Sequence, residues 1–293
     1  MSFVSSMRAL PAMVTPGWAF AHTVDSSTDG ALHLWRIDPL GAALLALLAG
    51  VYALGQWRVS RRSRGEHRTR ALCFWAGWAA LAVALGPPLE ALTPVSFAAH
   101  MTQHEIMMLA AAPLLVMARP LGTLLWGLPQ ALTGVVKAPV VRRAAGWLAA
   151  PLAAWLTHAV VLWGWHVPAA FEAGLRSEPV HWLQHVSFFA AAIIFWWSVF
   201  AGGRSGERRG IALLSVFTTA IHTTVLGVLL TFSTKIWYPT YAAAASPWDL
   251  SAIEDQQLGG LIMWVPGGMV FLAAGVALAA LWLKASEMRA ARG

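Results

Sequence analysis

Charged residues and cysteine are both scarce in this sequence of 293 residues. Only 11% of the residues are charged, whereas soluble globular proteins carry roughly 25% charge. Because 58% are hydrophobic, a protein core of this length could not hide so much apolar surface, and a bilayer is the environment that can. The single cysteine, Cys73, excludes a disulfide framework, a CxxC motif and a thiolate metal cluster.

Motifs of soluble enzymes are missing as well. The sequence has no Walker loop, no GxGxxG after a strand and no nucleophile elbow. The net charge of +7 does not indicate nucleic-acid binding, because the basic residues sit in short loops between apolar runs, where membrane topology puts them. No lysine lies within the last apolar run, since Lys284 follows it, and this argues against a rhodopsin.

Seven apolar runs are long enough to cross a bilayer, which takes about 20 helical residues. The sequence therefore predicts an all-α polytopic membrane protein, and its 17 tryptophans suit membrane–water interfaces. Between Leu121 and Leu132 lies a shorter run, bracketed by Pro120 and Pro129, that we expect to be interfacial or re-entrant. The predicted spans are 39–58, 71–89, 97–118, 147–168, 180–201, 210–232 and 257–283.

Basic residues predict the orientation. Of the 20 Lys and Arg residues, 16 lie in the segments 58–70, 119–146, 202–209 and 284–293. Since positive charge is retained in the cytoplasm, we expect the N-terminus outside and the C-terminus inside a bacterial plasma (inner) membrane. The expected organisation is an extracytoplasmic tail over 1–38, a seven-helix domain over 39–284 and a cytoplasmic tail over 285–293. Residues 1–21 resemble a weak signal peptide ending in Ala-Phe-Ala.

Histidines are the candidate functional residues, since ionisable groups within a bilayer are costly and rare. With this topology, seven of the ten lie between the outer surface and about the midplane. Two i,i+4 pairs occur, and such residues share a helix face with Cβ atoms about 6 Å apart, within reach of one metal ion. The alternative is a set of polar residues hydrogen-bonded between helices. The seven are His100, His104, His158, His166, His181, His185 and His222.

We expect His104 and His185 to bind metal together, with His100 and His181 as co-ligands or an entry step, His166 near the mouth and His158 and His222 near the midplane. Imidazole without thiolate suits Cu, Zn, Ni or Fe.

Two methionines and two acids could support this site. Met101 and Met108 are candidate thioether ligands that would favour Cu(I), with core packing as the alternative. Glu105 and Asp255 are candidate carboxylate partners of the imidazole N–H groups. For Glu105 the alternative is a structural pair, and for Asp255 it is charge compensation at the N-terminus of the last helix.

Several motifs, in order, resemble the CtaG-type cytochrome c oxidase assembly factors over roughly residues 90–285. They are HMTQH at 100–104, APLL at 112–115, LWGWHVP at 162–168, HWLQH at 181–185, FWW at 195–197, LGVLLT at 226–231 and DQQLGGLIMWVP at 255–266. The resemblance implies a non-enzymatic role in maturation of a haem–copper oxidase at the copper step. It also implies oxidase subunits as partners, with a periplasmic copper chaperone as a candidate supplier.

Two other functions stay open at this stage. A haem-binding electron carrier would use two facing histidines as axial ligands. A metal or proton transporter would need polar residues along its path, and the hydroxyl side chains of the sixth span (Ser215, Thr218, Thr219, Thr223 and Thr224) are candidates.

Overall fold

The structure is a computed structural model, and it describes residues 37–60, 67–201, 206–244 and 247–290. The predicted N-terminal tail and signal peptide lie almost entirely outside these residues. Every regular element in the described ranges is a helix, so the all-α prediction is confirmed. Six helical segments are long and apolar enough to cross a membrane, and there is a seventh if the bent pair α9–α10 is counted as one span.

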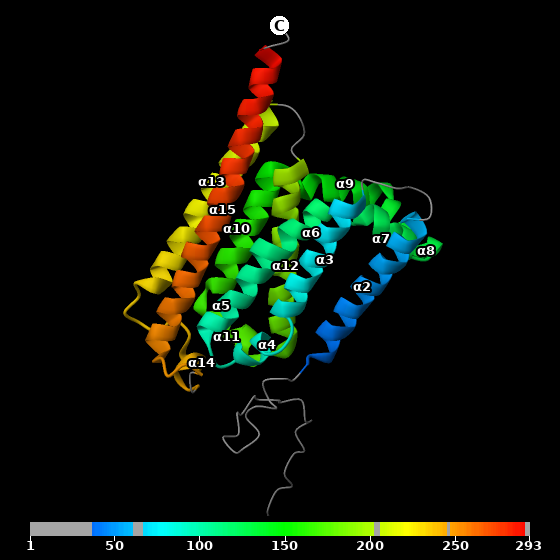
Figure 1. Cartoon of the computed structure of the whole chain (residues 1–293). Helices are drawn as coiled ribbons and strands as arrows, with labels where there is room; N and C mark the ends of the chain where they lie inside the picture. The colour runs from blue at the N-terminus through cyan, green and yellow to red at the C-terminus, as the bar shows by residue number, and fades with distance from the viewer. Residues whose placement is uncertain (1–36, 61–66, 202–205, 245–246, 291–293) are drawn as a thin grey trace, which may run out of the picture.

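The long helices form an up-and-down bundle (Figure 1). The spans are α2 (Pro39–Ser60), α3 (His67–Ala84), the rod of α5 (Phe97–Glu105), η1 (Ile106–Ala111) and α6 (Ala112–Ala118), then α10 (Pro151–His166), α12 (Glu178–Ala201), α13 (Gly206–Thr231) and α15 (Ala252–Ala290). The short helices are α4 (Leu89–Leu92), α7 (Leu121–Gly127), α8 (Gln130–Lys137), α9 (Pro139–Leu148), α11 (Pro168–Arg176) and α14 (Pro239–Ala242).

The fourth span differs from its prediction over 147–168. Helix α9 ends at Leu148, α10 begins at Pro151, and the two are bent by 73°. Ala150 is extended, with ψ of 136°, because the ring of a following proline disfavours the helical conformation. Val167 is extended before Pro168 for the same reason, so α10 ends at His166.

The third span contains a π-helical segment. The N–H of Ala112 bonds to the carbonyl of Met107, five residues back, and Pro113 has no N–H to offer. The Met108 carbonyl instead accepts a hydrogen bond of 2.9 Å from the indole of Trp196 on α12. This bond ties the histidine-bearing rod to the histidine-bearing α12.

The two ends of the bundle carry different connections. Figure 1 shows α4, α11 and α14 at one end, with α7, α8, α9 and the C-terminal end of α15 at the other. The segment 119–146 and the C-terminal end of α15, which were predicted to share a side, therefore share an end. Which end faces the cytoplasm stays a prediction.

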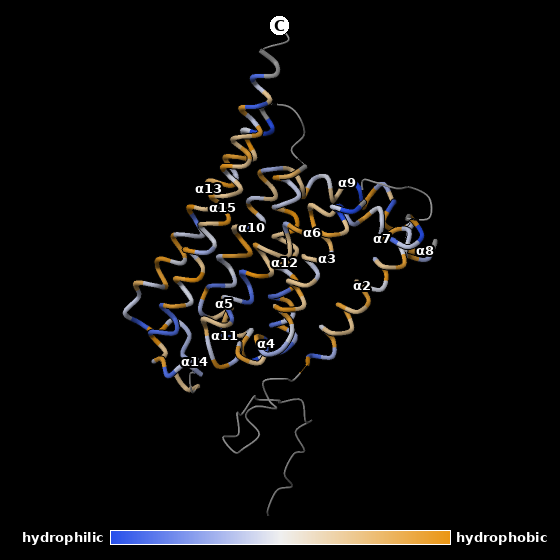
Figure 2. Tube along the Cα trace, viewed as in Figure 1, coloured by the Kyte–Doolittle hydropathy of each residue, from blue (hydrophilic) through white to orange (hydrophobic). Residues whose placement is uncertain are grey.

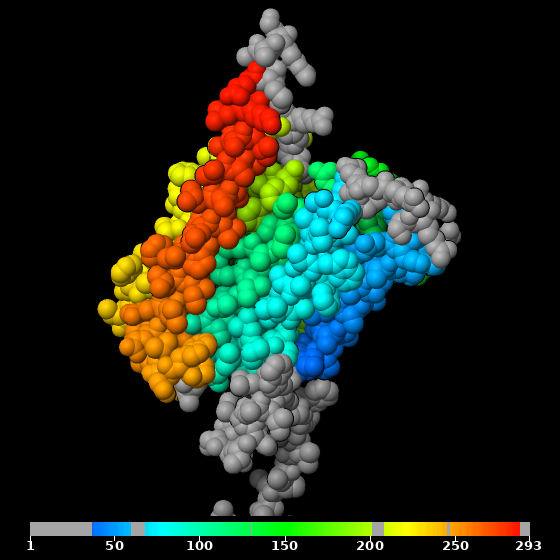
Figure 3. Space-filling model, viewed as in Figure 1, coloured from blue at the N-terminus to red at the C-terminus, as the bar shows by residue number. Residues whose placement is uncertain are grey.

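Hydrophobic residues make up most of the long helices (Figure 2), as expected for helices that cross a bilayer. On the face in Figure 3, the α5–η1–α6 rod is visible between α15 and α3. Small residues let some helices meet at backbone distance. A Cβ built at Gly55 of α2 would lie 1.9 Å from the carbonyl oxygen of Thr123 on α7. A Cβ built at Gly127 of α7 would lie 2.0 Å from the carbonyl oxygen of Val51 on α2.

Candidate metal centre

Four imidazoles from α5 and α12 converge in the half of the bundle near α4 and α11. His100, His181 and His185 each offer a ring nitrogen, and these atoms lie within 4.8 Å of one another. His104 joins them, because its Nε2 lies 3.2 Å from Nε2 of His100 and its ring centroid lies 5.3 Å from that of His185. The two i,i+4 faces thus meet.

The tautomer of His100 is fixed from outside the cluster. Tyr241, on α14, donates its hydroxyl proton to the Thr93 carbonyl at 3.0 Å. That oxygen can therefore only accept from Nδ1 of His100, 2.9 Å away. Burial raises the pKa of Tyr241, which keeps the hydroxyl neutral. His100 then carries its proton on Nδ1, and the Nε2 lone pair faces the other imidazoles.

The tautomer of His100 determines which nitrogen of His104 carries the proton. Nε2 of His100 is an acceptor, so Nε2 of His104 is the donor in their 3.2 Å contact, and the lone pair of His104 is on Nδ1. Within the described residues, Nδ1 of His104 and Nε2 of His185 are buried without a hydrogen-bond partner. Such groups cost about 1–3 kcal/mol each when unpaired, so the site suits a ligand that supplies the missing bonds.

His166 lies beside this cluster. Its Nδ1 donates to the Leu162 carbonyl at 2.7 Å, which leaves the lone pair on Nε2, a buried atom with no hydrogen-bond partner among the described residues. Its ring centroid lies 6.0 Å from that of Phe188, and the Phe188 centroid in turn lies 4.6 Å from that of His104. His166 is therefore one aromatic ring away from the four imidazoles.

His158 and His222 form a separate pair between α10 and α13, with ring centroids 5.8 Å apart. His158 contacts Phe195, two turns and about 10 Å along α12 from Phe188. The indole of Trp163 donates to Nδ1 of His222 at 3.4 Å, so neutral His222 is protonated on Nε2.

Met101 and Glu105 face α15 instead of the imidazoles. A Cβ built at Gly259 would lie 3.3 Å from Met101 Cγ, and one at Gly267 would lie 3.0 Å from Glu105 Oε2. Met108 packs in the hydrophobic core. The structure thus places Met101 and Glu105 toward α15 and Met108 in the hydrophobic core, and their roles as ligands or partners stay predictions.

The carboxylate of Asp255, on α15, compensates the partial positive charge at the N-terminus of another helix, α5. Its carboxylate accepts hydrogen bonds from Ser96 Oγ at 2.7 Å and from the backbone N–H of Phe97 at 2.6 Å and of Ala98 at 3.4 Å. A buried anion is thereby placed at the positive end of α5. The bonds fix the start of the helix one turn before His100.

The connection before α15 closes this end of the bundle. Tyr238 donates to the His166 carbonyl at 3.0 Å, and Thr240 donates to Glu172 through both its amide and its hydroxyl. Burial opposes ionisation of Glu172, but the bonds from Thr240 and the nearby Arg176 outweigh it, so the pKa of Glu172 is lowered. The segment that carries Tyr241 is thus held by an ionised carboxylate.

Sequence reasoning missed Tyr241, although a signal was available. The chain has only three tyrosines, and two of them, Tyr238 and Tyr241, are three residues apart in a connection next to the histidine-bearing helices. Ser96 also has the expected form of an N-cap before an apolar run, and its hydroxyl accepts from the Ala99 N–H.

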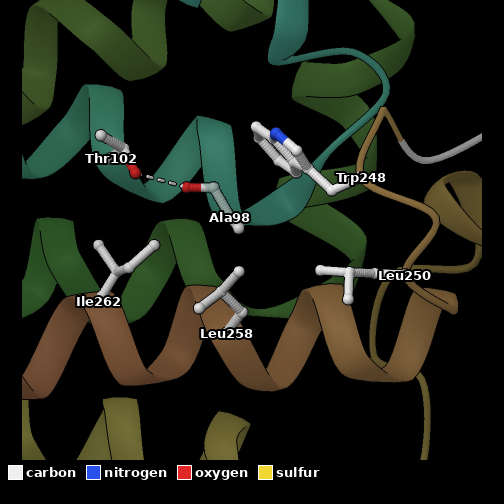
Figure 4. A pocket seen from close by; sticks show the side chains of 6 residues that line it. All are labelled: Ala98, Thr102, Trp248, Leu250, Leu258 and Ile262. Carbon is white, nitrogen blue, oxygen red and sulfur yellow. Dashed lines mark hydrogen bonds between the residues drawn. The ribbon is translucent and has the colours of Figure 1, made fainter.

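A groove of about 320 Å³ between α5 and α15 is a different feature. Figure 4 shows its lining of Ala98, Thr102, Trp248, Leu250, Leu258 and Ile262. Thr102 uses its hydroxyl to bond to the Ala98 carbonyl of its own helix. The groove contains no histidine and lies on the side of α5 opposite His100, so it is not part of the candidate metal centre.

Fold and site together define an integral membrane protein of six to seven spans with a buried cluster of imidazoles. Residues 50–285 match the family described as cytochrome c oxidase caa3 assembly factor (Caa3_CtaG). This chain therefore belongs to that family, as its sequence motifs indicated.

Two curated relatives are uncharacterized proteins of Mycobacterium bovis and Mycobacterium tuberculosis. Each is 27% identical over 274 residues, covering 89% of this chain but 41% of the relative. The chain thus spans about two fifths of the length of the curated relatives it matches. No solved structure matches this chain.

Proposed function

We propose that this protein is a non-enzymatic assembly factor that holds a copper ion on His100, His181 and His185, with His104 as a fourth ligand, and delivers it to a cytochrome c oxidase. The observation that carries the proposal is the convergence of three ring nitrogens within 4.8 Å in an apolar bundle. Membership of a family of oxidase assembly factors supplies the biological context.

The spacing of the three ring nitrogens is close to the spacing of nitrogen ligands around a bound metal ion. Metal–imidazole bonds are about 2.0–2.1 Å long, so a tetrahedral ion separates its nitrogens by about 3.4 Å. The observed spacing needs side-chain shifts of about 1 Å or less for each ring. The tautomer of His100, with Nδ1 bound to Tyr241 and Nε2 toward the cluster, is the arrangement in which an outer hydrogen bond orients a metal-binding imidazole.

Copper is favoured over other ions by the family to which the chain belongs. Imidazole donors without thiolate suit copper, zinc, nickel and iron, so the donor set alone does not choose among them. An assembly factor for a haem–copper oxidase has a use for copper, and the only cysteine, Cys73 on α3, is not among the candidate ligands.

The alternatives have less support. A porphyrin between His100 and His104 has no room, since their Nε2 atoms lie 3.2 Å apart. A transport path along α13 would use free hydroxyl groups. Ser215, Thr218 and Thr223 bond back to carbonyls of their own helix, which leaves Thr219, whose Oγ1 is buried without a partner among the described residues. An absorbance spectrum tests the haem alternative, because a Soret band would support it.

The proposal also includes the membrane in which the protein lies and the side that its imidazole cluster faces. Residues 39–284 act as one domain in a bacterial inner membrane, with the imidazole cluster on the extracytoplasmic side, where a periplasmic copper chaperone and oxidase subunits meet it. In a Cys73→Ala background, a cysteine at Ser177 should react with an impermeant thiol reagent in intact cells, and one at Glu287 should not. The reverse labelling would refute this orientation.

Metal analysis of purified variants tests the site. A His100→Ala/His185→Ala double variant should lose bound copper, and His104→Ala should weaken binding. A His158→Ala/His222→Ala variant is the matched control, because it also removes two imidazoles from within the bundle, and it should keep its copper. Helicity measured on each sample separates loss of ligands from loss of fold. A folded His100/His185 variant with a full complement of copper would refute the site.

A deletion strain tests the cellular role. Loss of the protein should lower the activity and copper content of a haem–copper terminal oxidase, and added copper should restore part of both. Normal oxidase activity together with normal copper content would refute a role at the copper step.

A further inference from the structure

The helices α8 and α9 leave an apolar surface uncovered at the end of the bundle opposite the metal centre. Their exposed apolar side chains include Leu132, Val135, Val140, Val141 and Trp147, each between 41% and 72% exposed. Neither helix contributes to the buried core clusters of the described chain. The surface therefore faces something outside the protein.

Both helices are amphipathic. At 100° per residue, Val140, Val141 and Trp147 lie on one face of α9. Arg142 lies opposite them, and Arg143 lies at the edge of the apolar face, beside Trp147. In α8 the apolar residues likewise share a face, and Lys137 lies opposite them. Short helices of this kind, with apolar side chains on one face and basic ones on the other, lie in the plane of a membrane interface.

The bend at Ala149–Ala150 turns α9 toward the plane of the membrane. Helix α10 crosses the bundle, and α9 meets it at 73°. Ten residues of helix rise about 15 Å, half of what a span requires. Helix α9 is thus too short to cross the membrane and is turned toward its plane, and Trp147 is a side chain that favours the headgroup region.

Positive charge on this surface has no acidic counterpart nearby in the chain. No Asp or Glu occurs between Glu105 and Glu172, whereas Lys137, Arg142 and Arg143 are all exposed. Guanidinium groups bind phosphate oxygens through paired hydrogen bonds. We propose that α8 and α9 form a docking surface for anionic phospholipid, with these three side chains on the headgroup phosphates and the valines and Trp147 among the acyl chains.

This surface is independent of the metal centre, so its test is separate. The protein in mild detergent is mixed with phosphatidylglycerol or phosphatidylcholine, and retained lipid is counted by native mass spectrometry. A Lys137→Gln/Arg142→Gln/Arg143→Gln variant should retain phosphatidylglycerol about fivefold less for each charge removed, since a basic residue near an anionic surface contributes about that factor. Retention of phosphatidylcholine should not change.

An Arg208→Gln/Lys284→Gln variant is the control, because it removes exposed charge from the same end but from other helices. It should behave like the unaltered protein, and equal thermal unfolding of all variants shows that none is misfolded. Undiminished phosphatidylglycerol retention by the triple variant would overturn the proposal. So would conversion of a dimer to a monomer with retention unchanged, which would assign the surface to a second copy of the chain.

Discussion

Replacing Tyr241 with phenylalanine removes a single oxygen atom that no metal would touch. In the native protein this hydroxyl accepts from Nδ1 of His100 at 2.9 Å and donates to the Thr93 carbonyl at 3.0 Å. His100 is 1% exposed and Thr93 is 2% exposed, so water cannot replace the lost partner. The substitution leaves one buried donor and one buried acceptor unpaired.

The expected magnitude follows from those two groups. Each unpaired buried polar group costs about 1–3 kcal/mol, so for two such groups the free energy of unfolding should fall by roughly 2–6 kcal/mol. The proton of His100 is also no longer held on Nδ1. Loss of such an orienting hydrogen bond lowers metal affinity by about 10–100-fold.

A matched control separates these two effects. Tyr238 is three residues away, is 1% exposed and donates to a backbone carbonyl, that of His166. Tyr238→Phe should therefore reduce stability without changing copper affinity. The assay is competition for Cu(I) against a chromogenic chelator in detergent, with thermal unfolding measured on the same samples. If Tyr241→Phe and Tyr238→Phe bind copper equally well, Tyr241 does not orient a metal ligand.

Three further results are expected. Asp255→Asn should lower stability by roughly 2–4 kcal/mol, because hydrogen bonds to a charged group contribute about 1.5–3 kcal/mol each; an unchanged thermal midpoint would contradict its role at the N-terminus of α5. Gly55→Ala should destabilise the protein by about 1–3 kcal/mol or more, because the new Cβ would lie 1.9 Å from the Thr123 carbonyl oxygen, whereas Gly50→Ala on the same helix has nothing within 4 Å and should not. The pKa of Glu172 is lowered below its usual 4.5. Its contribution to stability is therefore present above pH 4.5 and is lost as the pH falls through the lowered pKa. Glu172→Gln should flatten this acid-side dependence of the thermal midpoint, and an unaltered pH profile would contradict the assignment.

The sequence by itself determined the class of protein and most of its helices. Hydropathy is a property of consecutive residues, and a bilayer requires each span to satisfy its own backbone hydrogen bonds, so the apolar runs predicted the spans without knowledge of their neighbours. The i,i+4 spacing of His100 with His104 and of His181 with His185 likewise predicted shared faces, because one helix alone defines that geometry. The motifs were sufficient to indicate the family.

Only the tertiary structure decided which faces meet. Nothing local distinguishes the face of α5 that carries His100 from the one that carries Met101 and Glu105; the first meets α12 and the second meets α15 because of how the helices pack. The partner of Asp255 is the start of α5, about 160 residues earlier in the chain, and Tyr241 reaches His100 across a similar separation. Contacts between residues so distant in sequence depend on packing that no local pattern encodes.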